Sequence, residues 1–484
     1  MSEAVRKLEP KALWNHFADL NAVPRPSKKE ERVIQFMVDF GKSLGLETAT
    51  DAIKNIIIKK PATAGMEDRQ TVILQSHVDM VHQKNNETVF DFDKQGIDMV
   101  VDGDWVKANG TTLGADNGIG VASIMALLSS TDIAHPALEA MFTVDEETGM
   151  TGAKQLDPSF YDGTILLNLD TEDDDELSIG CAGGIDTNTS YDYTEVSTPS
   201  DVTSFSVTLK GLMGGHSGMD IDKGRGNANK LITRLIADAP VNIMLHSIDG
   251  GGLRNAIPRE AVAVVSVANA DKATLKNYIV QFETTIKVEY TPVEKNIMVV
   301  LEETETPLKM VEPTAQKNMI NALYALHNGV FKMSLAFDNL VETSSSLARV
   351  LIQDGKFTTQ SLQRSSVETT KRDVANTIRH TFELLGAKVE QTGDYPGWEP
   401  NPSSAILKTM AEMYRNKFNE EPQIKACHAG LECGILGKHL PDVDMISFGP
   451  NIRHAHSPDE CCQISSVQKF WSFLLDVLKE TPKK

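Results

Sequence analysis

The chain has 484 residues, of which 41% are hydrophobic and 24% are charged, and its formal net charge at pH 7 is -20. This length exceeds what one hydrophobic core usually supports, so we expect two or more domains. No apolar run approaches the roughly 20 residues of a membrane-spanning helix. The excess of acidic residues argues against nucleic acid and membrane surfaces as partners, because both require basic patches, and it suits a neutral or cationic small substrate.

Two helices are predicted at the start of the chain, over residues 11–21 and 28–45, with Ser27 as the N-cap of the second. Both stretches repeat apolar residues at helical spacing, and a proline-containing turn separates them. A strand over residues 53–60 is expected next. The side chains expected to face the core from the two helices are Trp14, Phe17, Ile34, Phe36 and Met37.

The next predicted strand covers residues 71–74 and ends in the polar stretch Gln-Ser-His77-Val-Asp79. An apolar run that ends in polar residues is typical of a buried parallel strand whose carboxyl end opens into a site. Residues two apart on a strand point to the same face, so His77 and Asp79 project together. Such a pair suits a metal ligand and its orienting carboxylate, although an isolated pair is more often a core histidine with a hydrogen-bond partner.

A surface hairpin is expected over residues 91–107, and a glycine-rich turn follows at residues 112–120. The turn reads Thr-Leu-Gly-Ala-Asp116-Asn117-Gly-Ile-Gly and runs into an apolar helix over residues 121–128. Its glycines allow the backbone to approach a ligand closely. The turn lacks the Gly-Lys-Ser/Thr of a phosphate-binding loop, and the carboxylate at its centre would repel an anion, so the turn favours a cation.

Two further apolar strands, residues 138–144 and 164–169, also end in acids. Adjacent carboxylates after a strand usually form a solvated turn, but a metal-assisted hydrolase needs both an acidic ligand and a carboxylate base. The acidic run at residues 172–176 is expected to be solvated surface. The acids that stand at the two strand ends are Glu146, Glu147 and Asp170.

Near the other end of the chain, residues 441–448 form another predicted strand, and a final helix is expected over residues 463–478. The loop between them contains His454 and His456. Strands that alternate with helices predict an α/β sheet, and the carboxyl ends of its parallel strands meet at one edge. The chain therefore brings two histidines, two aspartates and a glutamate to one edge, enough to hold two metal ions that share one carboxylate.

Between these parts the pattern changes and repeats itself, which indicates an inserted α+β domain of two tandem ferredoxin-like units. The domain boundaries that follow are 1–185 and 397–484 for a catalytic domain in two parts, and 186–396 for an inserted lid. In the first unit we expect strands over residues 204–210, 243–247, 261–268 and 296–301, with helices over 226–238 and 273–288. In the second unit we expect strands over residues 308–310, 340–354, 356–364 and 387–392, with helices over 314–327 and 368–385.

Three residues of the insert are candidates for function. His216 lies in the turn Gly-Gly-His-Ser-Gly after a strand, Asn255 precedes another strand, and Arg364 ends a strand of the second unit. Taken alone, each is equally well explained as part of a turn or as a surface charge.

Five motifs in chain order now form a recognisable set: His77-x-Asp79, Asp116-Asn117, Glu146-Glu147, Asp170 and His456-Ser-Pro. The set resembles the co-catalytic di-zinc exopeptidases, which include carboxypeptidase G, succinyl-diaminopimelate desuccinylase and carnosinase. The stretches Leu-Gly-Ala-Asp-Asn-Gly and Gly-Gly-His-Ser-Gly are closer still to the bacterial aminoacyl-histidine dipeptidases. The resemblance spans nearly the whole chain, and it implies a mostly parallel sheet flanked by helices together with an inserted lid.

The resemblance implies two zinc ions, for which Co2+ or Mn2+ can substitute. Asp116 would bridge the two ions, and its peptide bond to Asn117 would be cis. Glu146 would be the general base, and Asp79 would orient His77. The remaining implied ligands are His77 and Asp170 for one ion, and Glu147 and His456 for the other.

In the insert, the resemblance implies that His216, Asn255 and Arg364 contact the scissile carbonyl and the carboxylate of the substrate. Arg364 departs most from the family pattern. His456 is preferred over His454 as the ligand because it stands in the matching His-Ser-Pro context, whereas His454 could meet the substrate.

The implied activity is hydrolysis of unblocked dipeptides, with a preference for Xaa-His dipeptides such as carnosine. Two alternatives stay open: an N-acyl amino acid deacylase that uses the same metals, and a metal-binding protein without catalytic activity, which would be expected to lack Glu146. Related enzymes with a single-unit insert dimerise through it, whereas a doubled insert could satisfy that surface within one chain, so both a monomer and a homodimer are compatible.

The cysteines and the N-terminal residues suggest a cytoplasmic protein. Five cysteines are an odd number in a long chain and do not form a disulfide framework, and the start of the chain lacks the apolar core of a signal peptide. The cysteines are Cys181, Cys427, Cys433, Cys461 and Cys462.

Overall fold

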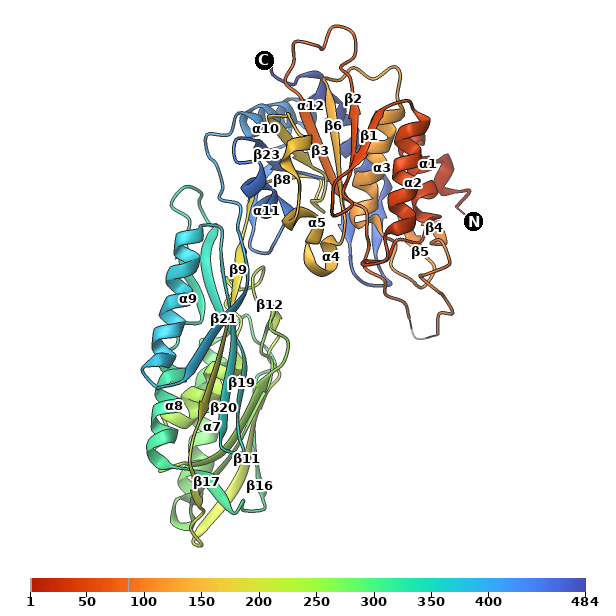
Figure 1. Cartoon of the computed structure of the whole chain (residues 1–484). Coiled ribbons are helices and arrows are strands. Elements are labelled where there is room, and N and C mark those ends of the chain that lie inside the picture. Colours follow the sequence, from red (N-terminus) through yellow and green to blue (C-terminus); the bar gives the residue numbers. More distant parts are fainter. Residues whose placement is uncertain (1, 86) are drawn as a thin grey trace. The chain divides into compact units, whose positions relative to one another are not determined.

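The computed structural model describes residues 2–85 and 87–484, and the chain divides into two compact units (Figure 1). Unit 1 comprises Met1–Gly180, Pro400–Ala426 and Leu431–Lys484, and unit 2 comprises Cys181–Glu399 and Cys427–Gly430. The sequence analysis placed residues 427–430 in the second catalytic segment, but they pack in unit 2. Among the described residues, no helix is long and apolar enough to cross a membrane.

Unit 1 is built on a mixed sheet with the strand order β1-β2-β6-β3-β7-β23-β8-β22. Strands β6, β3, β7 and β23 are mutually parallel, whereas β1, β2 and β8 pair antiparallel with their neighbours. The sheet is therefore parallel at its centre and antiparallel towards its edges, which refines the prediction of a mostly parallel sheet. The strands are β1 Glu47–Thr50, β2 Ile56–Lys60, β3 Val72–His77, β6 Leu138–Thr143, β7 Ile165–Asn168, β8 Glu176–Cys181, β22 Gln423–Cys427 and β23 Asp444–Ser447.

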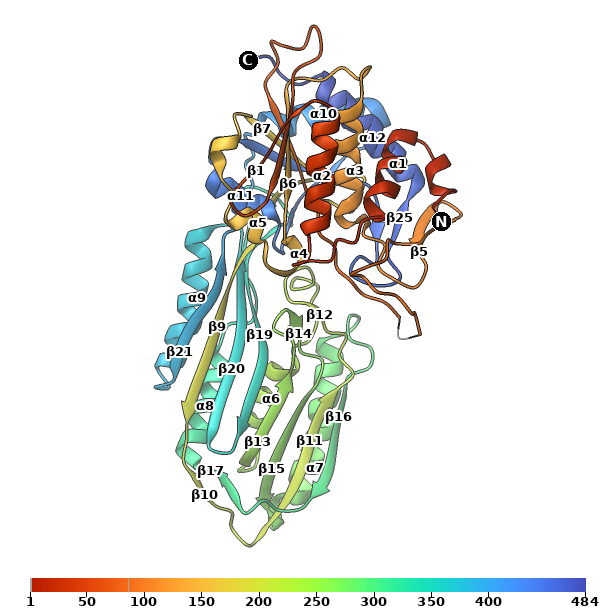
Figure 2. The same ribbon diagram turned by 45° about the vertical axis from the view of Figure 1, so that its right-hand side comes forward.

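Helices cover both faces of this sheet. Helices α2 and α3 lie on one side of it and α5 and α11 on the other (Figure 2). The central strands are accordingly buried along their whole length, as their continuous apolar runs predict. The helices of unit 1 are α1 Lys11–Asn21, α2 Glu31–Ser43, α3 Ala115–Ser129, α4 Glu146–Gly149, α5 Thr151–Lys154, α10 Ala405–Phe418, α11 Glu432–His439 and α12 Ile464–Lys479.

The N-terminal helices differ from the prediction in one detail. Helix α2 begins at Glu31 with Glu30 as its N-cap, and Ser27 instead donates a hydrogen bond from Oγ to Asp79 Oδ2 at 2.8 Å. Ser27 is therefore a partner of the site residues and not a helix cap. Of the expected core side chains, Trp14, Phe17 and Met37 are fully buried, and Ile34 and Phe36 are partly buried.

The predicted hairpin is present but shorter than expected, formed by β4 Met99–Asp102 and β5 Trp105–Ala108. Strand β5 also pairs with β25 Cys461–Gln463, which pairs with β24 Ile452–Arg453. The small sheet therefore anchors both ends of the loop that contains His454 and His456.

Unit 2 is built on a long antiparallel sheet with the order β16-β11-β15-β13-β19-β20-β9-β21, and β18 adds to β19. The helices of this unit are α6 Ala228–Ala237, α7 Lys272–Glu289, α8 Pro313–Ala325 and α9 Glu368–Glu383. Its main strands are β9 Gly183–Asp192, β11 Val202–Lys210, β13 Met244–Gly251, β15 Ala261–Ala268, β16 Met298–Thr304, β18 Gly329–Met333, β19 Val341–Gln353, β20 Lys356–Ser365 and β21 Lys388–Tyr395. Shorter strands are β10 Glu195–Ser197, β12 Gly215–His216, β14 Ala256–Ile257 and β17 Lys309–Val311.

The two ferredoxin-like halves are both present, but they are nested and not in tandem. The first half contains β11, β13, β15 and β16, as predicted. The second half takes β9 as its first strand, because β9 pairs with β20 and β21, whereas residues 309–311, predicted to lead in, pair with β10. The whole first half is thus inserted between the first strand and the first helix of the second. Strands β13 and β19 join the halves into one sheet.

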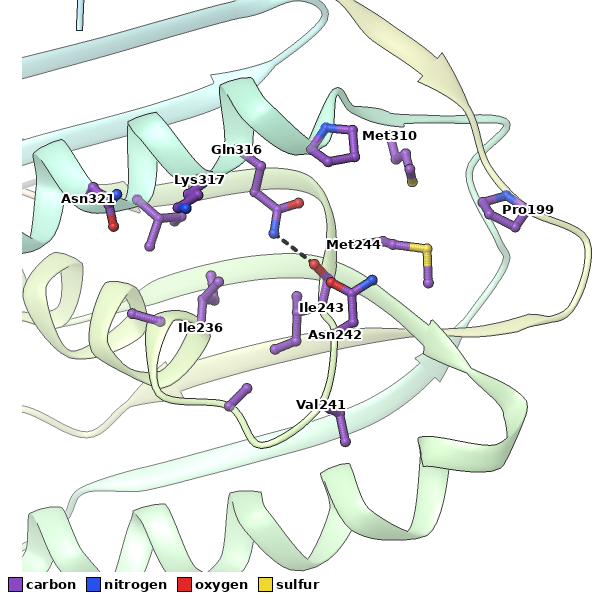
Figure 3. A pocket seen from close by; sticks show the side chains of 14 residues that line it. Pro199, Ile236, Val241, Asn242, Ile243, Met244, Met310, Gln316, Lys317 and Asn321 are labelled. Atoms are coloured by element: carbon purple, nitrogen blue, oxygen red, sulfur yellow. Dashed lines mark hydrogen bonds between the residues drawn. The ribbon is translucent and has the colours of Figure 1, made fainter.

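A cavity of about 600 Å3 lies between the two halves, next to α6, α8 and the start of β13 (Figure 3). Gln316 closes one side of it, donating from Nε2 to the carbonyl oxygen of Ile243 at 2.7 Å and accepting from the backbone N–H of Leu245 at 2.8 Å. These bonds tie α8 of the second half to β13 of the first.

Candidate metal centre

The predicted metal ligands converge at one edge of the unit 1 sheet. His77 ends β3, Asp170 lies two residues beyond β7, and Asp116 lies in the first turn of α3. Glu147 lies in α4, which follows β6, and His456 lies in the loop between β24 and β25. Strands β3 and β7 are parallel neighbours, so the sheet itself brings His77 and Asp170 together although they are far apart in the sequence.

A first group of possible ligand atoms comprises His77, Asp116 and Asp170, whose nearest donor atoms lie within 4.8 Å of one another. His77 Nε2 is 3.1 Å from Asp116 Oδ1 and 3.5 Å from Asp170 Oδ1. All three side chains are largely buried. Burial raises the pKa of Asp170 to about 6, and its contact with His77 opposes that rise.

A second group comprises Asp116, Glu147 and His456. His456 Nε2 lies 3.1 Å from Asp116 Oδ2 and 3.0 Å from Glu147 Oε2. Asp116 therefore faces one histidine with each of its two oxygens. The His456 side chain is 55% exposed, so the centre is open to solvent on its side.

The donor set fits a pair of divalent transition-metal ions. Imidazole nitrogen and carboxylate oxygen are the ligands of catalytic zinc sites, and a shared carboxylate is what a two-metal site requires. Asp170 Oδ1 and Glu147 Oε1 are also buried without a hydrogen-bond partner. Buried carboxylate oxygens of that kind are costly unless a cation or donor meets them, and a bound metal ion would satisfy both.

The peptide bond between Asp116 and Asn117 is cis, as the family resemblance implied. The backbone of both residues departs from helical geometry inside α3.

Asp79 lies behind His77 and contacts several parts of the site. Its Oδ1 is 3.3 Å from His77 Nδ1, and it accepts hydrogen bonds from Ser27 and from the backbone N–H groups of Glu146 and Glu147. Burial alone would raise the pKa of Asp79, but these partners, His77 first among them, lower it. The carboxylate therefore stays charged beside the imidazole.

Glu146 lies beside these residues but belongs to neither of the two ligand groups that contain Asp116. One of its oxygens lies within 4.8 Å of ligand atoms of His77 and Glu147. Burial raises the pKa of Glu146 well above its ordinary value, and His77 opposes this rise. The preceding residue, Asp145, has a φ of 52°, so the chain turns sharply from β6 into α4 at this point.

The acidic run at residues 172–176 is not the solvated surface that we expected. Glu172 is partly buried, and burial together with Asp116 and Asp170 raises its pKa to about 8. Asp173, Asp174 and Glu176 form ion pairs with Arg453, Lys469 and Lys425. A run of like charges gives no sign in the sequence of the distant cations that neutralise it.

Sequence reasoning also missed a buried polar layer beneath the ligands. Glu432, fully buried at the start of α11, accepts hydrogen bonds from Gln75 Nε2 at 2.6 Å and Thr143 Oγ1 at 2.7 Å. Asn168 donates to Gln75, and Ser447 donates to Asn168. Gln75 stands two positions before His77, and Asn168 stands two positions before Asp170. Polar residues inside otherwise apolar strands were the available sequence signal for this buried layer.

In unit 2, the Gly-Gly-His-Ser-Gly turn fixes the imidazole of His216. Its Nδ1 accepts the backbone N–H groups of Gly218 and Met219 at 3.2 and 3.0 Å. Burial, with a further contribution from Arg364, lowers the pKa of His216 to about 4. The ring is therefore neutral at pH 7 and carries its hydrogen on Nε2.

Arg364 lies directly under this turn. It is 5% exposed, its Nη1 donates to the Tyr395 hydroxyl at 3.0 Å, and its Nε is buried without a partner. A Cβ at Gly218 would collide with the carbonyl oxygen of His428 and press on Arg364, so the turn packs closely only with glycine. Burial, Arg364 and His216 lower the pKa of His428 to about 3.

Asn255 reaches the same turn through its backbone. Its carbonyl oxygen accepts the N–H of Ser217 at 2.8 Å, and the β12–β14 pairing places His216 opposite Ala256. The three predicted insert residues thus gather in one region of unit 2, together with His428 and Tyr395, which the sequence analysis did not identify.

Comparisons with known proteins agree with these observations. The chain is 43% identical to the cytosol non-specific dipeptidase of Escherichia coli (strain K12), with 100% of both chains covered. The crystal structure of aminoacylhistidine dipeptidase from Vibrio alginolyticus matches with a TM-score of 0.94 and 42% identity, again over 100% of both chains. Aminopeptidase PepT from Bacillus cereus shares the fold at a TM-score of 0.56 and 15% identity, covering 98% of this chain and 99% of its own. Residues 73–480 match peptidase family M20/M25/M40. The resemblance inferred from the motifs is thereby confirmed, and the chain belongs to peptidase family M20/M25/M40.

Proposed function

We propose that this peptidase hydrolyses unblocked dipeptides, Xaa-His dipeptides such as carnosine among them, with two zinc ions that Co2+ or Mn2+ can replace. The observation that carries the proposal is the sharing of Asp116 between two ligand groups, with Glu146 beside both. Full-length similarity to proteins described as a cytosol non-specific dipeptidase and an aminoacylhistidine dipeptidase supports the substrate class and a cytoplasmic location.

His77 and Asp170 would hold one ion, Glu147 and His456 the other, and Asp116 both. When bound, the ions would polarise the scissile carbonyl and make a water easier to deprotonate. Asp79 keeps His77 in one orientation through Nδ1, which leaves Nε2 directed at Asp116 and Asp170.

Glu146 is the proposed general base. A carboxyl group whose pKa is raised by burial can accept a proton from the attacking water and return it to the leaving amine. Asp79 also binds the backbone N–H groups of Glu146 and its neighbour, so the same carboxylate that orients His77 positions the base.

The residues of unit 2 would bind the substrate. The Nε of Arg364 is a buried donor without a partner, which suits a carboxylate such as the C-terminus of a dipeptide. His216, held neutral with its hydrogen on Nε2, is a suitable donor to the oxygen that becomes negative as the peptide bond is attacked. Asn255 is a further polar group of the same region and is proposed to contact the substrate.

Metal analysis combined with a substrate panel tests the proposal. The panel contains carnosine, other Xaa-His dipeptides, dipeptides without histidine, and N-acetyl amino acids, each assayed with the zinc-loaded and the chelator-treated protein. We expect two ions per chain and turnover of the free dipeptides that chelation abolishes. Turnover of N-acetyl amino acids alone would instead identify a deacylase, and a protein that binds fewer than two ions would contradict the shared-carboxylate site.

A further inference from the structure

The loop that presents Asp116 is held by a glutamate from the far end of the sequence. Glu460 is 2% exposed, and its carboxylate accepts four consecutive backbone N–H groups. One oxygen binds Leu113 and Gly114 at 2.8 and 3.0 Å, and the other binds Ala115 and Asp116 at 2.7 and 3.2 Å. One side chain thus fixes every peptide unit that leads into the shared carboxylate.

These are the N–H groups that a helix cannot satisfy itself. Helix α3 begins at Ala115, and its N-cap Gly114 has no side chain and a φ of 70°. The first amides of a helix have no intrahelical acceptor, and a negative charge there is favoured by the helix dipole. Glu460 supplies the acceptor for these groups. Burial raises the pKa of Glu460 to about 7 against the opposing backbone hydrogen bonds, so Glu460 also supplies the charge above about that pH.

A buried arginine holds the opposite side of the loop. Arg25 is 1% exposed and donates from Nη2 to the carbonyl oxygen of Gly114 at 2.6 Å. Its Nη1 donates to the carbonyl oxygens of Val78 and Asp79 at 3.1 and 2.9 Å, just beyond the end of β3. The loop is therefore fixed from its donor side and its acceptor side, and is tied to the strand that ends in His77.

Glu460 also belongs to the turn that presents His456. Its backbone N–H donates to the carbonyl oxygen of Ser457 at 3.0 Å, and Ser457 Oγ donates to that of His454 at 2.8 Å. His456 has a φ of 64°, a left-handed conformation that costs a non-glycine residue free energy unless its surroundings enforce it. The Glu460 side chain provides such an anchor four residues away.

We propose that Glu460 is a positioning residue that fixes the Asp116 loop and the His456 turn relative to each other, and so sets the affinity of the two-metal site. The inference rests on the proposed function, because it assumes that Asp116 and His456 are ligands. The Glu460 carboxylate binds backbone N–H groups and not the side chains of Asp116 and His456. Its effect would pass through the backbone of Leu113–Asp116 and through its own turn.

The test is a comparison of metal affinity in wild type, Glu460→Gln and Glu139→Gln by competition with a chromophoric chelator. Glutamine keeps the shape of the side chain, but its NH2 group faces backbone N–H groups that need an acceptor. Groups that orient metal ligands typically contribute roughly 10- to 100-fold in affinity, so Glu460→Gln should weaken binding by about that factor. The d–d absorption of the Co2+-loaded protein should change with it, which a loss of stability alone would not cause.

Glu139 is the matched control. It is 4% exposed and accepts backbone N–H groups of Asp162 and Gly163, but it lies near the start of β6, at the opposite end of the sheet from the ligands. Glu139→Gln should lower the melting temperature and leave metal affinity within about twofold of wild type.

Each outcome decides the matter. Wild-type affinity in Glu460→Gln, or equal weakening in both variants, overturns the positioning role while leaving the proposed function intact. Failure of the wild type to bind two ions overturns the proposed function and the inference with it. If Glu460→Gln does not fold, Glu460→Asp is judged by the same criteria, and failure of both to fold shows that the residue is only structural.

Discussion

Loading the metal-free protein with two divalent ions should release protons from His77 and His456. Hydrogen bonds to Asp116 and Glu147 raise the pKa of His456 to about 11 in the metal-free protein. Burial alone would lower the pKa of His77, but Asp170, Asp116 and Asp79 more than offset it and raise the value well above the ordinary one. Both imidazoles are therefore charged at pH 7, and both must be neutral to bind a metal.

The size of the effect follows from proton linkage. Each ion displaces one imidazole proton, so we expect at least about two protons released per chain at pH 7. Below the raised pKa values, the affinity for each ion should rise about tenfold per pH unit, and it should fall correspondingly in acid. Glu146 can contribute a further proton because burial raises its pKa as well.

Isothermal titration of Zn2+ in buffers of different ionisation enthalpy measures the number of protons released. The variant His456→Gln should release about one proton fewer than wild type, and Glu146→Gln removes the contribution of the base without removing either imidazole. Release of less than about half a proton per ion at pH 7 would show that the histidines are neutral before metal binds. The neighbouring carboxylates would then not raise the pKa values of His77 and His456.

Three substitutions separate the proposed roles. Glu146→Gln should keep both metals and lose about 10²- to 10⁴-fold in kcat because the amide cannot accept a proton; near-normal turnover by the metal-loaded variant would exclude Glu146 as the base. Asp116→Ala should lower metal content itself, since both ligand groups use this carboxylate, and full occupancy measured by atomic absorption would contradict the bridging role. His216→Ala should reduce kcat roughly 10²- to 10³-fold with unchanged metal content, whereas a residue that only stabilises its own turn would alter the melting temperature and leave kcat nearly normal.

The centre of the fold could be predicted because its signals are local. Apolar runs that end in a histidine or an acid mark the central strands and the residues at their carboxyl ends. The bounds of β6 and β7 were predicted to within one residue, whereas β3 continues three residues beyond its apolar run, to His77. The boundaries of α1 and β15 match the prediction fully.

The features that the sequence analysis missed depend on long-range pairing. Strand β9 has many polar residues and becomes a strand because β20 and β21 flank it, so its place could not be seen in its own residues. Glu460 follows the His456-Ser-Pro motif without being part of it, and Arg25 lies in a proline-containing turn; the role of both appears only when the backbone groups that they bind are known.

The nesting of the two halves of unit 2 has a consequence for how the chain is made. All strands of the first half lie within about 100 consecutive residues, so that half is complete soon after its last strand has been synthesised. Strand β9 precedes it but finds its partner only in β20; Thr189, for example, bonds Thr359. Because a protein is synthesised from its N-terminus, β9 has to remain unpaired with β20 while the entire first half is translated. The second half can therefore complete its sheet only after the first half has been synthesised.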